Sequence, residues 1–135
     1  MSQGNVEIVR GLVDSWNNRD LQAMLAQAHR EVEYVNAPTA VEPGTRRGQD
    51  ELADVLRAQW EALPGGRQEI ELIDDRGDEV ITVGRVSRLL PESDALIDAP
   101  AVISWRFRDG RVIRIEVLGI GPEFQKALEA AGLRE

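Results

Sequence analysis

The chain has 135 residues, 42% of them hydrophobic and 30% charged, which favours one globular domain over 1–135. Its formal net charge of −8 argues against nucleic acid and anionic membranes as partners, and the lack of cysteine excludes disulfides and thiolate chemistry. The N-terminus does not read as a signal peptide, and no apolar stretch approaches the ~20 residues that cross a bilayer, so we expect a cytoplasmic protein.

The first half of the chain predicts three helices and one short strand. Asp20 is suited to cap the second helix, and residues 32–36 read as the strand. Residues 37–48, with two prolines and glycines, read as a loop, and a third helix is expected over about 50–63. The apolar stripes of the first and third helices consist of Ile8, Val9, Leu12, Val13 and Trp16, and of Leu52, Val55, Leu56, Trp60 and Leu63.

The second half changes to an alternating pattern, which predicts a meander of long strands. The strands are expected at about 68–73, 80–90, 101–108 and 111–120. A loop is expected over 91–95, and Asp109-Gly110 is a strong hairpin signal. Gly121-Pro122 opens a short C-terminal helix, and Gly132 suits the position just past its end.

This order of elements predicts an α+β domain in which helices cover one face of a curved antiparallel sheet. Gly84 and Gly119 interrupt strand patterns, and glycines inside strands often mark bulges or bends. A strongly curved sheet with helices across its mouth would form a cone with a cavity inside.

Four stretches carry a resemblance to a known group of proteins. They are NVEIVRGLVDSWNNRDLQAML, VEYVNAP, RRGQDELADVL and SWRFRDGRVIRIEVL. Over residues 5–133 the chain resembles the SnoaL-like, polyketide-cyclase-like group of the nuclear-transport-factor-2-like superfamily. The resemblance implies a cone-shaped, cystatin-like α+β barrel with three N-terminal helices. It does not name a function, because this fold hosts isomerases, hydrolases, dehydratases, cyclases and binding domains.

Ketosteroid isomerases are one enzymatic group to which the resemblance extends. It places Asn36 where their base carboxylate would stand, and Leu12 and Ile103 where their oxyanion-hole Tyr and Asp would stand. An amide cannot take a proton at neutral pH, and the two aliphatic residues cannot donate to an enolate. Ketosteroid isomerase activity is therefore not expected.

Limonene-type epoxide hydrolases are more similar in one segment. They carry Tyr-x-Asn-x-Pro, as in Tyr34 to Pro38, where the Tyr and Asn help to hold the attacking water. Their Arg-x-Asp corresponds to Arg85 and Ser87, and their second aspartate falls near Val117. Both acids that this reaction needs are missing, so we do not expect it either.

Tyr34 and Asn36 lie two apart on a predicted strand and so share a face. We predict that they face the cavity, and the full set of predicted ligand-binding residues is Tyr34, Asn36, Arg85, Ser87, Trp105, Trp16, Trp60, Ile103 and Val117. Alternatives remain open: the pair could tie down the following loop, Arg85 could form an ion pair with Glu69, Glu71 or Asp98, and the tryptophans could belong to the core.

No catalytic residue is fixed by the pattern, and the candidates are Asn36 and Asp98. The alternative for Asp98 is a capping or strand-start carboxylate. His29 is the only histidine and reads as a helix-end residue, so we expect no metal site. The chain shows no phosphate-binding glycine motif, so we expect no cofactor.

Two functional hypotheses follow. In the first, the protein binds a small, mostly apolar, oxygen-bearing metabolite in the cone, and cofactor-free cyclase, isomerase or lyase-type chemistry is an extension of it. In the second, it is a non-catalytic domain that forms a homodimer through the outer face of the sheet. That face would present Arg106, Arg108, Arg114 and Glu116. An open, polar-lined cavity favours the first hypothesis, and a cone filled by the three tryptophans favours the second.

Overall fold

The computed structural model describes residues 2–38, 40, 42–89 and 96–133. The predicted loop over 91–95 lies outside the described residues. The helices are α1 (Ser2–Asn17), α2 (Leu21–Gln27), α3 (Gly48–Ala62) and α4 (Phe124–Ala130), with a 3₁₀ turn η1 (Gly121–Glu123). The strands are β1 (Ala28–Asn36), β2 (Gly44–Arg47), β3 (Arg67–Asp75), β4 (Glu79–Leu89), β5 (Leu96–Arg108) and β6 (Arg111–Ile120). In the part of the chain that is described, no helix is both long and apolar enough to cross a membrane.

The described strands form one open sheet in the order β2-β1-β6-β5-β4-β3. The expectation of an antiparallel sheet is correct for the β3–β6 meander. The pair of β1 and β2, which the sequence does not predict, is also antiparallel. The expectation is wrong for β1 and β6, which run parallel. A parallel pair needs a long connection between its strands, and here everything from β2 to β5 provides it.

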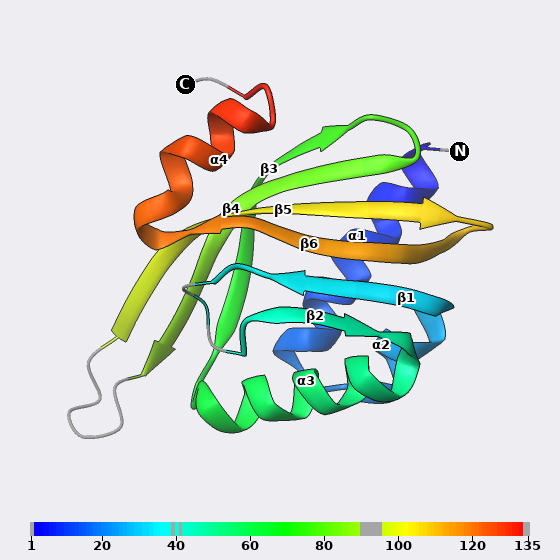
Figure 1. Cartoon of the computed structure of the whole chain (residues 1–135), viewed down its shortest axis with the longest axis horizontal. Coiled ribbons are helices and arrows are strands. Elements are labelled where there is room, and N and C mark those ends of the chain that lie inside the picture. The colour runs from blue at the N-terminus through cyan, green and yellow to red at the C-terminus, as the bar shows by residue number, and fades with distance from the viewer. Residues whose placement is uncertain (1, 39, 41, 90–95, 134–135) are drawn as a thin grey trace.

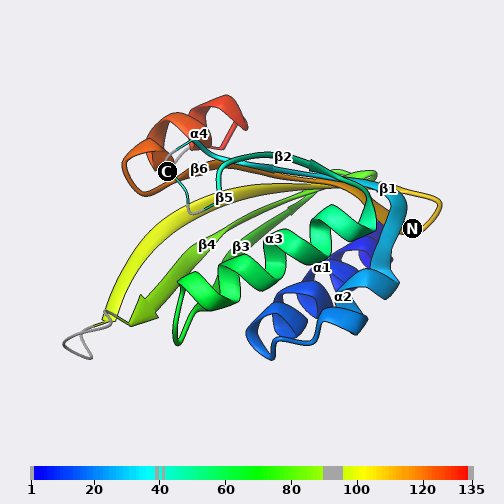
Figure 2. The same cartoon turned by 60° about the horizontal axis from the view of Figure 1, so that its bottom comes forward.

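The sheet curves around the N-terminal helices, as the α+β class predicts (Figures 1 and 2). Helices α1, α2 and α3 cover the concave face, and α4 packs on the opposite, convex face (Figure 2). The main core lies under the three helices and includes Val9, Val32 and Val80, each fully buried. A smaller cluster around Ile81 and Val102 lies under α4.

Bulges occur at both glycines that the sequence singles out. The pairing of β3 with β4 shifts register opposite Gly84, and the pairing of β5 with β6 shifts next to Gly119. A methyl group at Gly84 would lie 1.9 Å from the carbonyl oxygen of Glu69, so only glycine fits. At Gly119 a methyl group would meet Ala127 of α4 at 2.7 Å. Glycine is needed at both positions because a neighbouring atom approaches closely, and the two register shifts lie where bends were predicted.

The second helix is shorter than expected, and β2 was not predicted. Ala28 already has extended backbone angles, so β1 begins there rather than at residue 32. Strand β2 reads GTRR and has no apolar alternation. It exists because its backbone pairs with β1 at the sheet edge, where Arg47 bonds Glu33 at 2.7 Å. Tertiary pairing of this kind leaves no local signal.

Candidate ligand-binding cavity

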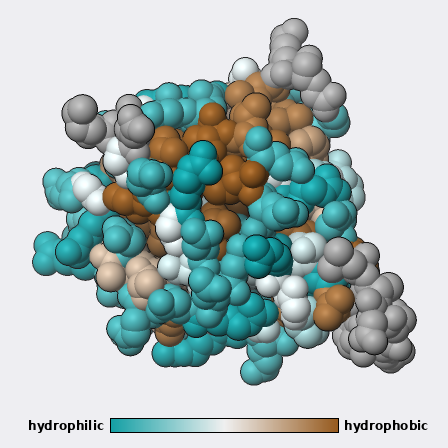
Figure 3. All heavy atoms as spheres, turned by 180° about the vertical axis from the view of Figure 1, so that it is seen from behind, coloured by the Kyte–Doolittle hydropathy of each residue, from teal (hydrophilic) through white to brown (hydrophobic). Residues whose placement is uncertain are grey.

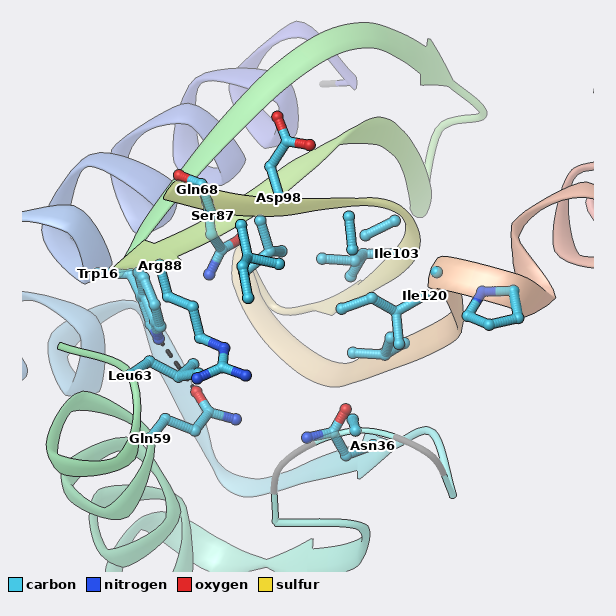
Figure 4. Close-up of a pocket in the computed structure, with 18 of the residues that line it drawn as sticks. Trp16, Asn36, Gln59, Leu63, Gln68, Ser87, Arg88, Asp98, Ile103 and Ile120 are labelled. Atoms are coloured by element: carbon cyan, nitrogen blue, oxygen red, sulfur yellow. Dashed lines mark hydrogen bonds between the residues drawn. The ribbon is translucent and has the colours of Figure 1, made fainter. Parts of the chain in front are cut away.

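A cavity of about 310 Å³ lies between the concave face of the sheet and helices α1 and α3 (Figure 4). This volume is at the lower end of the ~300–1,000 Å³ range of small-molecule sites. Most of the wall is apolar, with Ala99, Ala101, Ile103 and Val117 supplied by β5 and β6. The polar side chains in the wall are Tyr34, Asn36, Gln59, Gln68, Ser87, Arg88 and Asp98.

The cavity continues towards the core as a narrow void of about 30 Å³. Tyr34 and Gln59 line both spaces, and so does Trp16. Trp105 and Met24 line only the deeper void. The polar groups of Tyr34 and Gln59 therefore stand where the wide cavity narrows.

Gln59 holds the Tyr34 phenol in place. Its amide nitrogen donates to the phenol oxygen at 2.8 Å, and its amide oxygen accepts from the Trp16 indole N–H at 3.1 Å. Among the described residues, no acceptor meets the phenol hydrogen, which leaves it to bond a group in the cavity. Burial raises the pKa of Tyr34, so the phenol stays neutral and protonated at physiological pH. The site thus presents an oriented hydrogen-bond donor in an apolar wall.

Asn36 combines two of the predicted roles. It lines the cavity together with Tyr34, as the two-residue spacing predicts. Its side chain also accepts from the N–H of Ala37 at 3.0 Å and donates to the carbonyl of Glu42 at 3.2 Å. The asparagine is buried and therefore also ties the end of β1 to the segment that leads into β2.

Arg85 does not line the main cavity, so its predicted place there is wrong. Strand register pairs Arg85 with Pro100 and Gly84 with Ala101, which puts Arg85 on the convex face. There it binds Asp98 through two hydrogen bonds of 2.7 and 3.1 Å. This is the ion pair that the sequence left open as the alternative, and the hydrogen bonds from Arg85 lower the pKa of Asp98.

Of the other predicted lining residues, Trp105 and Trp60 lie outside the main cavity. Ser87, opposite Asp98 in the sheet, lines the cavity as predicted. Trp105 is buried, with its N–H donating to Thr82 at 2.9 Å. Trp60 packs on Trp16 with ring centroids 6.4 Å apart and bonds its carbonyl. Trp16, Ile103 and Val117 line the cavity as predicted.

Three polar lining residues were not predicted from the sequence: Gln59, Gln68 and Arg88. For Gln59 a signal existed, because it falls three residues after Leu56 and four before Leu63 in the apolar stripe of α3. A polar residue inside such a stripe is buried, and Gln59 is 5% exposed. Gln68 and Arg88 had no comparable signal, since their strands mix polar and apolar residues on both faces.

The described residues of the cavity wall provide hydrogen-bond donors but few groups that could act as an acid or a base. Its one carboxylate is Asp98, and the close-up shows this side chain pointing away from the cavity (Figure 4). Leu12 is buried in the core, and Ile103 and Val117 line the cavity as aliphatic residues. In the described part of the chain, no group of three or more His, Asp or Glu side chains could hold a metal ion.

The chain belongs to the SnoaL-like domain family, whose model matches residues 9–115. TerC, crystallised with polyporic acid, is 24% identical, with a TM-score of 0.76 over 93% of this chain and 98% of that one. An NTF2-like protein from Burkholderia thailandensis E264 is 24% identical, with a TM-score of 0.76 over 90% and 95%. A putative SnoaL-like polyketide cyclase from Jannaschia sp. CCS1 is 20% identical, with a TM-score of 0.73 over 85% and 84%. Among curated proteins none matches.

These structural neighbours are all less than 25% identical, so they establish the fold of this chain but not an activity. The chain is a SnoaL-like domain with the NTF2-like α+β fold.

Proposed function

We propose that this SnoaL-like domain binds a small, mostly apolar, oxygen-bearing metabolite in the cavity under its sheet. The observation that carries the proposal is the Tyr34 phenol, which Gln59 holds at 2.8 Å inside an apolar cavity of about 310 Å³. A carbonyl or hydroxyl oxygen of the ligand would accept the phenol hydrogen, and the aliphatic wall would cover the rest. Oriented polar groups in a mostly apolar concave site are the usual makeup of small-molecule pockets.

The cavity mouth supports the apolar part of this proposal. Described large hydrophobic side chains with substantial exposure are Leu72, Leu89 and Ile97. Ile97 lines the cavity and pairs with Arg88 of β4, and Leu89 is the next residue of β4 after Arg88. Apolar side chains also gather on part of the back of the molecule (Figure 3). An apolar ligand that enters at the mouth would cover Ile97, which is otherwise 38% exposed.

Cofactor-free cyclase, isomerase or lyase-type chemistry is the catalytic extension of the proposal. In it, Tyr34 would polarise a carbonyl oxygen and stabilise negative charge that develops there. No carboxylate of the described wall points into the cavity, so such a reaction would draw its base from the substrate or from water. Binding is therefore proposed as the primary activity.

The test is native mass spectrometry and thermal shift with terpenoid, steroid and polyketide fragments. Polyporic acid belongs in the panel because TerC, which shares the fold, was crystallised with it. A hit should bind less tightly to Tyr34→Phe, by about tenfold, because one buried hydrogen bond is lost. Asn36→Ala should also weaken binding, because Asn36 lines the cavity and fixes the segment beside it. If no fragment binds and both variants melt like the wild type, the proposal fails.

The homodimer remains the second candidate. The cavity separates the two hypotheses: an open, polar-lined cavity favours ligand binding, and a cone filled by Trp16, Trp60 and Trp105 favours the structural domain. Pairing of two copies is compatible with both functions, because it would use the convex face and leave the cavity free.

A further inference from the structure

One polar group in the cavity wall carries a positive charge. Arg88 is near the end of β4 and extends from that strand into the cavity (Figure 4). Its side chain is half-buried. Across residues 2–38, 40, 42–89 and 96–133, no hydrogen bond or ion pair engages its guanidinium.

The contrast with Arg85 on the same strand comes from the strand register. Arg85 faces the convex side, where it meets Asp98. Arg88 pairs with Ile97 and faces the concave side, where Val86 and Ala99 are its lining neighbours. Within the described residues, this permanent cation thus stands in a mostly apolar wall, with no carboxylate directed at it. A charge in such surroundings is costly unless another group compensates it.

We propose that the ligand carries an oxyanion, with a carboxylate as the best-matched group, and that Arg88 binds it. This inference rests on the proposed binding function and names the class of molecule that the cavity takes. The planar guanidinium donates two parallel hydrogen bonds that fit a carboxylate, and both are strengthened where water is partly excluded. The ligand is then an apolar body with an acidic group at Arg88 and an acceptor oxygen at Tyr34.

The overall charge of the protein sharpens this expectation. With a formal net charge of −8, the molecule repels anions at long range. A preference for an anion over a neutral molecule of the same shape must therefore come from a local cation. This makes a matched pair of probes decisive.

The experiment compares two fluorescent probes with the same aromatic skeleton. 1-Anilinonaphthalene-8-sulfonate carries an oxyanion, and N-phenyl-1-naphthylamine lacks it. Both are titrated into the wild type and into Arg88→Gln, with Arg111→Gln as the control. Arg111 is exposed next to the Asp109-Gly110 turn, away from the cavity lining, and its loss changes the net charge equally.

A third variant, Ala99→Phe, tests whether the probes occupy the cavity. Ala99 lines it, and a phenyl ring there would fill part of the space. Both probes should bind Ala99→Phe less tightly than the wild type. The proposed function itself fails if neither probe binds the wild type. It also fails if Ala99→Phe binds both probes as tightly as the wild type does.

The expected result for Arg88→Gln is a loss of about tenfold or more in affinity for the sulfonate, with the neutral probe unchanged, because one charge-assisted contact is removed. Arg111→Gln should bind both probes as the wild type does. If Arg88→Gln binds both probes unchanged while Ala99→Phe binds neither, the inference is overturned and the binding function stands. Should Arg88→Gln not fold, Arg88→Lys with a salt titration decides: sulfonate binding must weaken with salt while binding of the neutral probe does not.

Discussion

The amide nitrogen of Gln59 on α3 donates a 2.8 Å hydrogen bond to the phenol oxygen of Tyr34 on β1. The amide oxygen of Gln59 meanwhile accepts from Trp16 on α1. One buried glutamine therefore joins two helices and a strand at the point where the cavity narrows. It fixes both the position of the phenol and the direction of its remaining hydrogen bond.

We expect Tyr34 and Gln59 to be energetically coupled. Tyr34→Phe leaves a Gln59 amide hydrogen without its acceptor, and Gln59→Leu leaves the Trp16 N–H without one. Each change should cost about 1–3 kcal/mol of unfolding free energy in urea titrations. The double variant should cost less than the sum by roughly 1 kcal/mol, because the shared bond is lost only once. Additive losses would mean that the hydrogen bond does not form in solution.

The bulge at Gly84 should tolerate no side chain. Gly84→Ala would place a methyl group 1.9 Å from the Glu69 carbonyl oxygen, so β3 or β4 must move. We expect a loss of about 3 kcal/mol or more, or failure to fold, in thermal and urea unfolding. The matched control is Gly11→Ala in α1, where nothing lies within 4 Å and the backbone is helical. That variant should be more stable than the wild type by roughly 0.5–1 kcal/mol. Equal stability of the two variants would contradict this account of the curvature.

Most of the fold could be predicted because its signals are local. The Asp20 cap, the Asp109-Gly110 turn and the change from helical to alternating periodicity all lie within a few residues of what they specify. Strand β2 could not be predicted, because it forms only by pairing with β1, which lies earlier in the chain. The parallel pairing of β1 with β6 is non-local for the same reason.

The site could be predicted where the sequence pattern shows which face of a strand points to the cavity. Tyr34 and Asn36 precede a loop and share a face by alternation alone. Strand β4 is different, because Val80 packs under the N-terminal helices while Ile81 packs under α4. With apolar residues on both faces, the pattern does not say which side the cavity occupies, and Arg85 was assigned to the wrong one.

Asp98 should behave as a structural carboxylate. The hydrogen bonds from Arg85 lower its pKa below the ordinary value of 3.8. A lowered folded-state pKa means that the pair contributes stability above pH 3.8 and that this contribution is lost as the pH falls through the folded-state pKa. Asp98→Asn should therefore melt slightly below the wild type at pH 7, by a few degrees at most because the pair is exposed. The difference should shrink in acid.

The control for Asp98→Asn is Asp54→Asn, which removes the same charge from the exposed side of α3. Ligand or probe binding should be unchanged in both variants, since the Asp98 side chain points away from the cavity. Loss of binding in Asp98→Asn alone, with its melting temperature unaffected, would instead make Asp98 a site residue.

We expect the protein to form a homodimer at micromolar concentration through the convex face of the sheet. Part of that face is covered by α4, and the remainder presents Arg106, Arg108 and Arg114. Arg106 and Arg114 bond Glu79 and Glu33 within the chain, while no described side chain pairs with Arg108. Arg108 is thus the residue most available to a second copy.

Light scattering coupled to gel filtration measures this directly. The wild type should show twice the chain mass of 15.0 kDa. Arg108→Glu should shift the dissociation constant about tenfold or more towards monomer, because it reverses one charge on each side of a symmetric interface. The control is Arg10→Glu, which makes the same charge change at an exposed position of α1 and should leave the mass unchanged. A wild type that stays at 15.0 kDa at every concentration would rule out the dimer and leave ligand binding by a monomer as the proposed function.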